Sequence, residues 1–494
     1  MKRVFSEFHK PLTRRELLIL GAATLIAGLI YLVASALTYK IGFPLDDSWI
    51  HLTFARNLAY YGEWAFRHGQ PAAGSTSPLW SALLSLGFLV RLEPYIWTYF
   101  LGLLVLWTLG VLSEIAARRL VVTYKPRIPW VGLFMIVEWH FLWAAMSGME
   151  TLLHGLIVTV ILIALMLNSR RYLTLGLLTG LSVWVRPDGL TLLAPLLLAV
   201  ILTEKDTKSR LRGLTQCFIG FGTLFFFYLL FNLLIGGTPM PNTFYAKQAE
   251  YAAWQARPLL ERSGELFLQL LVGPSFLLVP GTIMWTVRSV KAKSWGSLLA
   301  LTWSIGYMFI YLLRLPVYQH GRYIIPAMPI FFLLGLLALL EFASLKKLGR
   351  YHWLASMLWD TSVVMVTILF IILGANSYAS DVALIEQEMV TTAIWVSANI
   401  PPDAVLAVHD IGALGYFDDH RLIDLAGLIS PEVVPFIRDE ERLTEYLNAY
   451  NANYLIAFSD LYPKMQAGRE IVFVSSGTMA AELQSGHMTV FRWK

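Results

Sequence analysis

Cysteine and charge are the scarcest features of this chain. Its 494 residues include a single cysteine, Cys217, which lies in an apolar segment. One cysteine excludes a disulfide framework and any cysteine-based zinc or iron–sulfur site. Charged residues make up 14% of the chain, whereas a soluble domain has about a quarter. This composition excludes a disordered chain, a fibrous chain and an ordinary cytosolic enzyme.

Long apolar segments are abundant in this chain. Hydrophobic residues make up 57% of it, and its 17 Trp and 22 Tyr fit the aromatic belts of a membrane protein. A helix needs about 20 apolar residues to cross a bilayer. We identify about 11–12 apolar segments, which predict an all-α, multi-pass membrane fold. They are 17–38, 78–117 with a break at 91–94, 128–146, 150–167, 172–186, 189–202, 214–235, 267–287, 296–314, 323–343 and 354–374.

Charge divides the chain into two parts. Residues 1–374 hold 31 Lys and Arg against 17 Asp and Glu, a net charge of +14. Residues 375–494 hold 7 against 16, a net charge of −9, and contain no long apolar run. We therefore expect a transmembrane catalytic domain over 1–374 and a soluble, extracytoplasmic α/β domain over 375–494. We expect no nucleic-acid partner, because the positive-inside rule explains the basic excess.

The basic residues also predict sidedness. Six clusters hold 21 of the 31 basic residues before position 375: 2–15, 118–127, 170–171, 205–212, 288–293 and 346–350. Placing them in the cytoplasm of a plasma-membrane protein puts the acidic tail and the long polar loops outside. One conflict follows, because an odd number of crossings must lie between 77 and 118, where two apolar segments occur. We expect one of these two to be re-entrant or interfacial.

The tail has the pattern of a small α/β domain. Strands are predicted at 405–417, 453–458, 470–476 and 488–493, and helices at 382–399 and 439–450. On the predicted topology, six polar segments of the first 374 residues all fall on the outer face. They are 43–66, 74–80, 147–151, 186–189, 236–247 and 318–323. We infer that they form a single site at the outer membrane surface.

Asp46 and Asp47 are the first candidates for catalysis. Adjacent carboxylates repel each other, and burial raises the pKa of at least one. A raised pKa suits a general base that acts on a hydroxyl. The pair could instead hold a divalent cation or form a solvated turn. Residues 48–62 show helical spacing of apolar side chains, so an interfacial helix is expected to hold the two acids at the membrane surface.

Four cations suit a phosphate-bearing ligand: Lys247, His320, Arg322 and Arg186. Arginine binds phosphate in a bidentate manner, and lysine acts as a point charge. The alternative is that these residues only anchor helices at the lipid headgroups.

Further ionisable residues lie at the ends of apolar segments or inside them. Glu150 and Asp188 are candidates for substrate binding, since intramembrane charges are functional by default, although Asp188 could simply pair with Arg186. The same two interpretations apply to Glu138 and His140. In the tail, a further pair follows a predicted strand, where it either faces the membrane site or is solvated: His409 and Asp410.

Several motifs together resemble one family. The acidic pair, GSTSPLW (74–80), SGMET (147–151), RPDG (186–189), TPMPNTFYAK (238–247) and HGRY (320–323) are similar to those of polyprenyl-phosphate-dependent GT-C glycosyltransferases. The nearest likeness is to bacterial cell-wall arabinofuranosyltransferases. The tail motifs HDIGALGYF (409–417) and RLIDLAGLISPEV (421–433) fit as well, so the resemblance spans nearly the whole chain.

The resemblance implies a membrane transferase whose active site faces away from the cytoplasm. Its donor would be a sugar on a polyprenyl phosphate, and its acceptor a hydroxyl of a glycan, lipid or protein. The loop acid of the family corresponds to Asp46 or, ranked second, Asp47. Lys247 and Arg322 match basic positions for the donor phosphate, and Asn242 and Tyr245 of the TPMPNTFYAK motif join the candidates for substrate binding.

The sequence leaves alternatives for both the cofactor and the function. Other GT-C branches bind a metal near the loop acid, but no reliable metal-ligand spacing occurs here, so a divalent cation is optional. The alternative function is a transporter or flippase of a lipid-linked or polar substrate. That function explains the large first loop and the soluble tail poorly, and no repeat relates the two halves, as is common in transporters. The tail could also be a carbohydrate-binding module that positions the acceptor.

Overall fold

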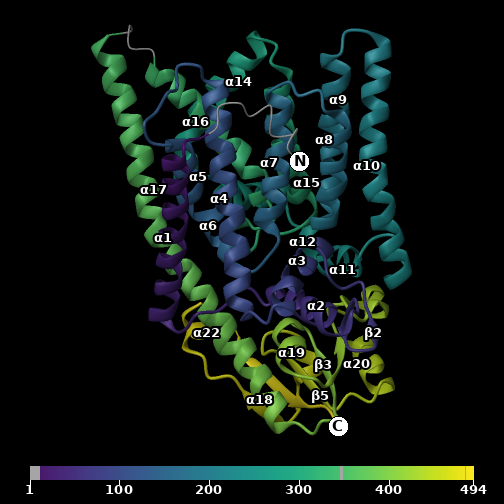
Figure 1. Ribbon diagram of the computed structural model, residues 1–494. Coiled ribbons are helices and arrows are strands. Elements are labelled where there is room, and N and C mark those ends of the chain that lie inside the picture. The colour runs from purple at the N-terminus through teal and green to yellow at the C-terminus, as the bar shows by residue number, and fades with distance from the viewer. Residues whose placement is uncertain (1–11, 345–348, 484–485) are drawn as a thin grey trace.

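A helical body with a small sheet-containing domain at one end makes up the computed structural model, which describes residues 12–344, 349–483 and 486–494 (Figure 1). Several residues of the predicted basic clusters lie outside these ranges: Lys2, Arg3, Lys10, Lys346 and Lys347.

Six stretches of helix in the described ranges are long and apolar enough to cross a membrane. Five of them contain α1 (Arg14–Thr38), α4 (Pro94–Leu120), α10 (Thr207–Gly236), α15 (Trp295–Arg314) and α16 (Met328–Ser344). The sixth begins with α17 (Arg350–Ile385). A bent pair, α13 (Leu259–Leu271) and α14 (Ser275–Lys291), meets at 96° and would make a seventh.

The remaining predicted segments form shorter apolar helices. They are α3 (Pro78–Leu89), α5 (Trp130–Val137), α6 (Trp139–Met146), α7 (Thr151–Met166), α8 (Tyr172–Val185) and α9 (Leu193–Thr203). Every predicted apolar segment is therefore helical, but several are too short to span a bilayer alone.

The two segments between 78 and 117 differ in length. Helix α3 has 12 residues and α4 has 27. The Glu93 side chain accepts a hydrogen bond from the Ile96 amide at 3.1 Å, and Pro94 is the first residue of α4, so the chain breaks and restarts here. Only α4 has the length of a span, while α3 lies beside α2 (Asp47–Tyr61) near the sheet domain (Figure 1).

The apolar segment 128–146 is interrupted at Glu138. Its carboxylate accepts hydrogen bonds from the backbone amides of His140 and Phe141 and contacts His140 Nδ1 at 2.8 Å. Glu138 therefore caps α6, and His140 contacts the Gln269 carbonyl with its other nitrogen at 3.2 Å. Glu138 and His140 therefore stabilise the break between α5 and α6. Of the two interpretations of these residues, substrate binding or pairing within the fold, their contacts support pairing.

The chain passes from the membrane body to the sheet domain without a break. Helix α17 runs through position 374, the predicted end of the first domain, and continues into a π-helix (Glu386–Val390) and α18 (Thr391–Asn399). Glu388 in the π-helix accepts hydrogen bonds from Ser475 Oγ and from the Met488 amide of the sheet domain.

Five strands form a mixed sheet in the order β4-β3-β5-β7-β6. They are β3 (Val405–Val408), β4 (Arg421–Asp424), β5 (Tyr454–Phe458), β6 (Ile471–Val474) and β7 (Met488–Arg492). Pairs β3–β4 and β3–β5 are parallel, whereas β7 is antiparallel to β5 and β6. The predicted helix at 439–450 is α20 (Glu440–Ala449).

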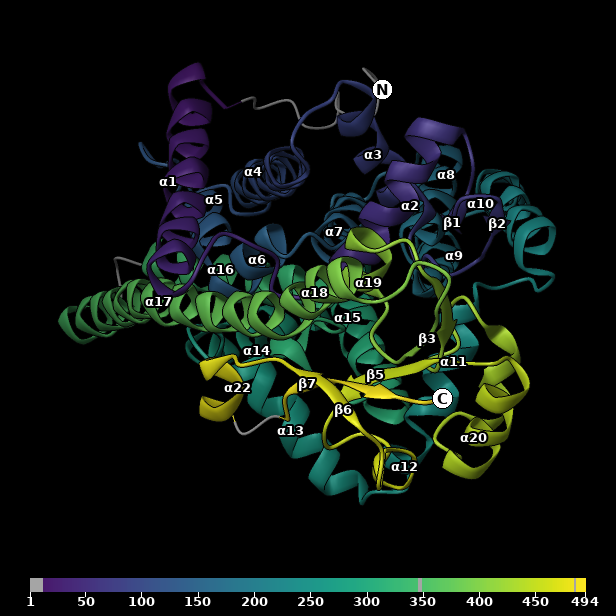
Figure 2. The same ribbon diagram turned by 90° about the horizontal axis from the view of Figure 1, so that it is seen from below.

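Two details of the tail prediction are wrong. The segment 405–417 is not one strand, because β3 ends at Val408 and α19 (Gly412–Phe417) follows. Strand β4 was not predicted at all. Side chains alternate between the two faces of a strand: Leu406 and Val408 pack into the core shared with the membrane helices, and Ala407 packs into a core on the opposite face. In the view from below, the strands lie next to α18 and α19 (Figure 2).

Candidate active site

Contacts join all six polar segments at the end of the helical body that faces the sheet domain. Ser48 Oγ donates to the Ser147 carbonyl at 2.6 Å, and Trp80 Nε1 donates to the Gly148 carbonyl at 2.8 Å. The other joining pairs are Arg186–Glu150 at 2.7 Å, Asp47–Arg322 at 2.8 Å and Thr76–Thr243 at 3.4 Å. The structure thus brings the segments into one site, as the sequence predicted.

Asp46 faces the sheet domain. Its two oxygens accept hydrogen bonds from the backbone amides of Gly412 at 2.7 Å and Ala413 at 2.8 Å, at the start of α19. Burial raises the pKa of Asp46 to about 7, and the carboxylate of Asp410 adds to this, although the two amides oppose it. Asp46 therefore connects the loop before α2 to the sheet domain.

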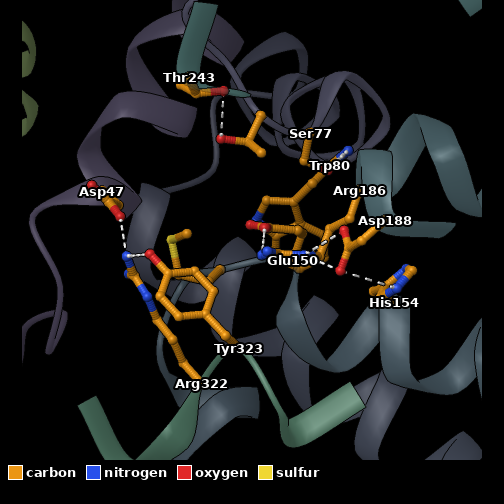
Figure 3. Close-up of polar contacts among 12 residues, drawn as sticks. Asp47, Ser77, Trp80, Glu150, His154, Arg186, Asp188, Thr243, Arg322 and Tyr323 are labelled. Atoms are coloured by element: carbon orange, nitrogen blue, oxygen red, sulfur yellow. Dashed lines mark hydrogen bonds and ion pairs between the residues drawn. The ribbon is translucent and has the colours of Figure 1, made fainter. Parts of the chain in front are cut away.

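Asp47, the first residue of α2, points toward Arg322 (Figure 3). Its Oδ2 lies 2.8 Å from Arg322 Nη2, and its side chain lines a small hollow together with His51, Thr243 and Lys247. Burial alone would raise the pKa of Asp47, but the charges of Arg322 and Lys247 outweigh it and hold the pKa below its ordinary value. Asp47 is therefore an ionised carboxylate beside an open space.

Tyr323 links the cations around Asp47. Its hydroxyl accepts hydrogen bonds from Arg322 Nη2 at 3.0 Å and from Lys247 Nζ at 3.2 Å. Its ring also lies 5.7 Å from the Arg186 guanidinium. A single phenol thus holds three positive groups around one side of the site.

Arg186 is the centre of a second buried cluster (Figure 3). Its guanidinium contacts Glu150 at 2.7 Å and Asp188 at 3.2 Å, and donates to the Tyr311 hydroxyl at 3.2 Å. Glu150 also lies 3.2 Å from His51 Nε2, one turn along α2 from Asp47. Asp188 pairs with Arg186, which is one of the two roles that the sequence suggested for it. Both residues also line the cavity described next.

A cavity of about 510 Å³ adjoins the small hollow. Thr76, Thr243 and Lys247 line both spaces. Its polar wall includes Arg186, Asp188, Lys247, Gln248, Tyr311, Arg314 and Tyr323. Apolar side chains complete the lining: Leu190, Met240, Phe244, Ile310, Leu313 and Leu315.

Three apolar side chains of this cavity reach the surface of the helical body. Leu190, Ile310 and Leu313 remain 37%, 41% and 43% exposed. A cavity lined by three cations and by exposed apolar side chains suits an amphiphilic anion.

Four other predicted site residues lie apart from this cavity. Asn242 Nδ2 donates to the Leu428 carbonyl at 3.1 Å, so it joins α11 (Asn242–Glu250) to the sheet domain. His320 Nε2 contacts Asp381 at 2.8 Å. Tyr245 packs its ring against Phe244.

The fourth of these residues, His409, belongs to the contact between the two domains. Its Nδ1 contacts the Tyr462 hydroxyl at 2.8 Å, and its Nε2 lies 3.4 Å from Glu250. Burial raises the pKa of the neighbouring Asp410, and His409 opposes this shift. Asp410 lies close enough to Asp46 and Asp47 to interact with both charges.

Sequence reasoning missed Tyr323, His51 and Tyr311. Tyr323 stood inside the HGRY motif, where only the cations were selected. His51 lies four residues after Asp47, and this spacing places two side chains on one face of a helix. Tyr311 lies in an apolar helix and had no signal of its own.

The donors at the site do not fit a divalent cation. Among the described residues, no group of three His, Cys, Asp or Glu side chains gathers with the geometry of a metal site. Asp47 is already paired with Arg322, and Lys247 lies beside it. Hard cations need several oxygen ligands free of competing positive charge, so we derive no step through a metal.

By sequence, a known protein family matches one part of this chain. A domain of unknown function, DUF8728, matches residues 373–491. None of the curated proteins matches this chain.

Solved structures match over most of the chain. ArnT from Cupriavidus metallidurans bound to undecaprenyl phosphate is 14% identical, with 98% of this chain and 99% of that chain covered and a TM-score of 0.61. The Archaeoglobus fulgidus oligosaccharyltransferase in its apo form is 12% identical, with 88% and 69% covered and a TM-score of 0.56. The arabinofuranosyltransferase AftD from Mycobacteria is 13% identical, with 92% and 37% covered and a TM-score of 0.50.

These neighbours are GT-C glycosyltransferases. The predicted fold is confirmed: the chain is a multi-pass membrane protein with the GT-C fold and a sheet-containing domain at its C-terminal end.

Proposed function

We propose that this chain is an integral-membrane glycosyltransferase that moves a sugar from a polyprenyl-phosphate donor to an acceptor hydroxyl outside the cytoplasm. One observation carries the proposal: the Asp47 carboxylate lines a hollow that adjoins a cavity lined both by cations and by apolar side chains that reach the protein surface. The shared fold with ArnT, whose structure holds undecaprenyl phosphate, supports a lipid-linked donor.

The cavity matches the two halves of such a donor. Lys247 and Arg186 of the cavity lining suit the phosphate, which in the sugar-linked donor has two non-bridging oxygens that accept charge-assisted hydrogen bonds and gains a third when the sugar leaves. The isoprenoid chain would leave sideways over Ile310 and Leu313, which are exposed where the helix meets lipid. The sugar would then lie toward the small hollow, where Asp47 and His51 are.

The chemistry is a displacement at the anomeric carbon. Asp47 takes the proton of the acceptor hydroxyl while the hydroxyl oxygen bonds to this carbon and the carbon–phosphate oxygen bond breaks. The polyprenyl phosphate leaves with the electron pair, and the cations of the site stabilise its charge. Attack from the face opposite the phosphate inverts the anomeric configuration.

Donor binding also changes the basicity of Asp47. Without donor, Arg322 and Lys247 hold the pKa of Asp47 low, which makes it a weak proton acceptor. A phosphate that shares these cations adds negative charge nearby and raises the pKa of Asp47. Asp47 therefore becomes an effective base when the donor is present.

We assign the base to Asp47 and not to Asp46, which the sequence ranked first. A pKa of about 7 would suit Asp46 for proton transfer. Geometry comes before pKa, however. Both oxygens of Asp46 accept backbone hydrogen bonds from α19, and Asp46 does not line the cavity or the hollow.

An extracytoplasmic site in the plasma membrane is part of the proposal. Helix α9 ends and helices α10 and α17 begin at the end of the body away from the sheet domain (Figure 1). The described basic residues of 205–212 and 346–350 lie at these helix ends: Lys205, Lys208, Arg210, Arg212 and Arg350. The positive-inside rule places this end in the cytoplasm. The site and the sheet domain then face outward.

The test is sugar transfer by the full chain in detergent, where transport cannot register. A panel of undecaprenyl-phosphate pentoses and hexoses with labelled sugars is incubated with cell-envelope extract as the acceptor source. We expect label to move from one donor into envelope material, and not to move with the Asp47→Asn variant. No transfer from any donor, together with donor movement across sealed vesicles, would favour the transporter.

A further inference from the structure

Helix α11 connects the cavity to the sheet domain. It has nine residues, Asn242–Glu250, and lies at the end of the helical body that faces the sheet domain (Figure 1). An isolated helix shorter than about 12 residues is only marginally stable in water. The position of α11 therefore depends on its contacts with the rest of the molecule.

One face of α11 belongs to the candidate active site. Thr243 and Lys247 line both the cavity and the hollow, and residues four apart lie on the same side of a helix. Lys247 Nζ donates to the Tyr323 hydroxyl at 3.2 Å and lies 5.3 Å from the centre of its ring. This face carries the cation that the proposed function assigns to the donor phosphate.

A different face of α11 contacts the sheet domain. Asn242, Ala246 and Glu250 follow the same spacing of four residues. Asn242 Nδ2 donates to the Leu428 carbonyl at 3.1 Å. A Cβ on Gly427 would lie 3.7 Å from Ala246 Cβ. Two of the three side chains therefore pack on the loop that follows β4.

One buried side chain shapes the loop on which α11 packs. Asp424 is the last residue of β4 and is buried. Its carboxylate accepts hydrogen bonds from the backbone amides of Ala426, Leu428 and Ile429 at 2.5–2.8 Å. Three charge-assisted hydrogen bonds to one carboxylate fix the backbone around it. Helix α11 therefore rests on a loop whose own conformation is held by the sheet domain.

Glu250, the third side chain of this face, forms the ionic contact with the sheet domain. Its Oε1 lies 2.9 Å from Arg438 Nη2 and 3.4 Å from His409 Nε2. Burial alone would raise the pKa of Glu250, but the hydrogen bond with His409 and the charge of Arg438 hold the pKa below its ordinary value. A carboxylate at the last residue of a helix is disfavoured by the helix dipole. The pairing with the sheet domain compensates for this position.

Two residues around Glu250 have an unusual backbone conformation. Arg438 and Tyr462 have φ angles of 70° and 56°, which residues other than glycine rarely adopt. The Arg438 guanidinium lies 5.7 Å from the centre of the Tyr462 ring, and the Tyr462 hydroxyl contacts His409 Nδ1 at 2.8 Å. Backbone strain of this kind gathers at functional sites. The strain supports a functional role for the contact with Glu250.

We propose that the sheet domain completes the donor site by holding α11 in place, with Glu250 as the positioning residue for Lys247. The inference rests on the proposed function, because it assigns a part in donor binding to a second domain of the same transferase. Residues 373–491, which match a domain of unknown function, then serve the donor phosphate without touching it.

The test measures how tightly undecaprenyl phosphate binds to the full chain in detergent. Glu250→Gln should weaken binding about tenfold, or about 1.4 kcal/mol, as Lys247→Gln does. Electrostatics alone predicts the opposite sign, because loss of a nearby carboxylate favours a bound anion. Tighter binding by Glu250→Gln would therefore overturn the proposal.

The variant with both substitutions shows whether Glu250 acts through Lys247. It should bind undecaprenyl phosphate no more weakly than Lys247→Gln alone, because the two residues then belong to one unit. Independent effects would instead multiply to a loss of about a hundredfold. That result would contradict a positioning role.

A second glutamate–arginine pair of the same outer segment is the matched control. Glu261 in α13 pairs with Arg257 at 2.5 Å, and Glu261 lines neither the cavity nor the hollow. Glu261→Gln should leave binding unchanged. From the sheet domain, Arg438→Met should weaken binding, whereas Arg438→Lys keeps the charge and should restore most of it. Equal losses in Glu250→Gln and Glu261→Gln would overturn the proposal.

Hydrogen exchange separates this proposal from the proposed function, because it needs no ligand. The backbone amides of 243–250 should exchange about tenfold faster in Glu250→Gln and in Arg438→Met than in the wild type, since local opening of α11 becomes easier. Unchanged exchange in both variants contradicts the role of the sheet domain alone. A wild-type chain that does not bind undecaprenyl phosphate contradicts the proposed donor instead, whereas the exchange rates still decide whether the sheet domain holds α11.

Discussion

The two sides of the Asp46–Asp47 pair have opposite electrostatic surroundings. Toward the cavity, Asp47 meets cations, namely Arg322 and Lys247. Toward the sheet domain, Asp46 meets backbone amides and another carboxylate, Asp410. Successive residues at a helix start point about 100° apart, so two neighbouring acids serve different parts of the molecule. The pair lies at a boundary: Asp47 lines the hollow beside the cavity, and Asp46 joins the helical body to the sheet domain.

The largest expected effect comes from a substitution of Asp47, the acid of the pair that lies on the cavity side. Asp47→Asn removes the base but keeps the volume and the helix start. We expect transfer to fall about 10³-fold, within the range for loss of a general base, with undecaprenyl-phosphate binding retained. Initial rates in detergent with labelled donor measure it.

Asp46→Asn is the matched control for that variant. It leaves the cavity intact and replaces a carboxylate whose ionisation opposes folding by a neutral amide that can still accept a hydrogen bond from α19, so its rate per folded molecule should stay near that of the wild type. If Asp46→Asn loses as much kcat as Asp47→Asn while remaining folded, the assignment of the base is wrong.

The next effect concerns the cations of the cavity wall. Arg186→Met leaves Glu150 and Asp188 as buried carboxylates without their partner, since Arg186 contacts both. Breaking such a buried pair costs about 3–5 kcal/mol, so we expect a large drop in the melting temperature. Intrinsic tryptophan fluorescence during a thermal ramp in detergent measures the change.

Arg314→Met provides the comparison for Arg186. Arg314 lines the same cavity, is exposed, and has no carboxylate partner among the described residues. Its loss should leave the melting temperature within about 1 °C of the wild type. Equal melting temperatures for Arg186→Met and the wild type would show that the buried cluster does not support the fold.

A smaller effect separates phosphate binding from membrane anchoring. Lys247→Gln removes one charge from the polar wall, and we expect undecaprenyl phosphate to bind about tenfold more weakly, or about 1.4 kcal/mol. Lys291→Gln removes an exposed charge at the end of α14 and should change nothing. Similar small losses for both variants, measured by ligand-induced thermal shift, would support the anchoring role for Lys247.

The smallest expected effect is a pH-dependent change in melting temperature when Asp410, the acid beside Asp46, is replaced. Because the folded pKa of Asp46 is raised to about 7, its ionisation opposes folding: stability decreases from about pH 4 to pH 7 and stays lower above it. Asp410→Asn removes a repelling charge. It should therefore raise the melting temperature by about 1–2 °C at pH 8 and much less at pH 5, where Asp46 is mainly protonated.

An exposed acid of the same domain is the control for this pH dependence. Asp403→Asn should have the same small effect at both pH values, since Asp403 is exposed. A stabilisation by Asp410→Asn that is larger at pH 5 than at pH 8 would contradict the electrostatic account of the domain contact.

The sequence predicted most of what depends on local pattern. Apolar length predicted the apolar helices of the membrane body but not α11, which lies in a polar segment. The polar islands predicted a single site because charge placed them all on one face. The break at Pro94 was visible, but only helix length decided that α4 and not α3 has the length of a span. The boundary at 374 was chosen from composition, and one helix runs through it.

Long-range contacts explain what the sequence did not predict. The segment GALGYF resembles a strand in composition, yet Asp46, 366 residues earlier, accepts hydrogen bonds from the first amides of α19. Strand β4 has only four residues and follows a polar turn, so its pattern is too short to recognise. The ranking of Asp46 over Asp47 had the same limit, because side-chain direction at a helix start depends on the rest of the fold.

The unbroken path from α17 into α18 has a mechanical consequence. Arg350–Asn399 forms one helical rod from the far end of the membrane body to the sheet, and Glu388 fastens its lower part to β7 through the Met488 amide. A rod of this kind carries torque but does not fold like a hinge. The sheet domain is therefore expected to move with the bundle. Under the proposed function, the lipid-borne sugar would arrive laterally and the acceptor would come in from water.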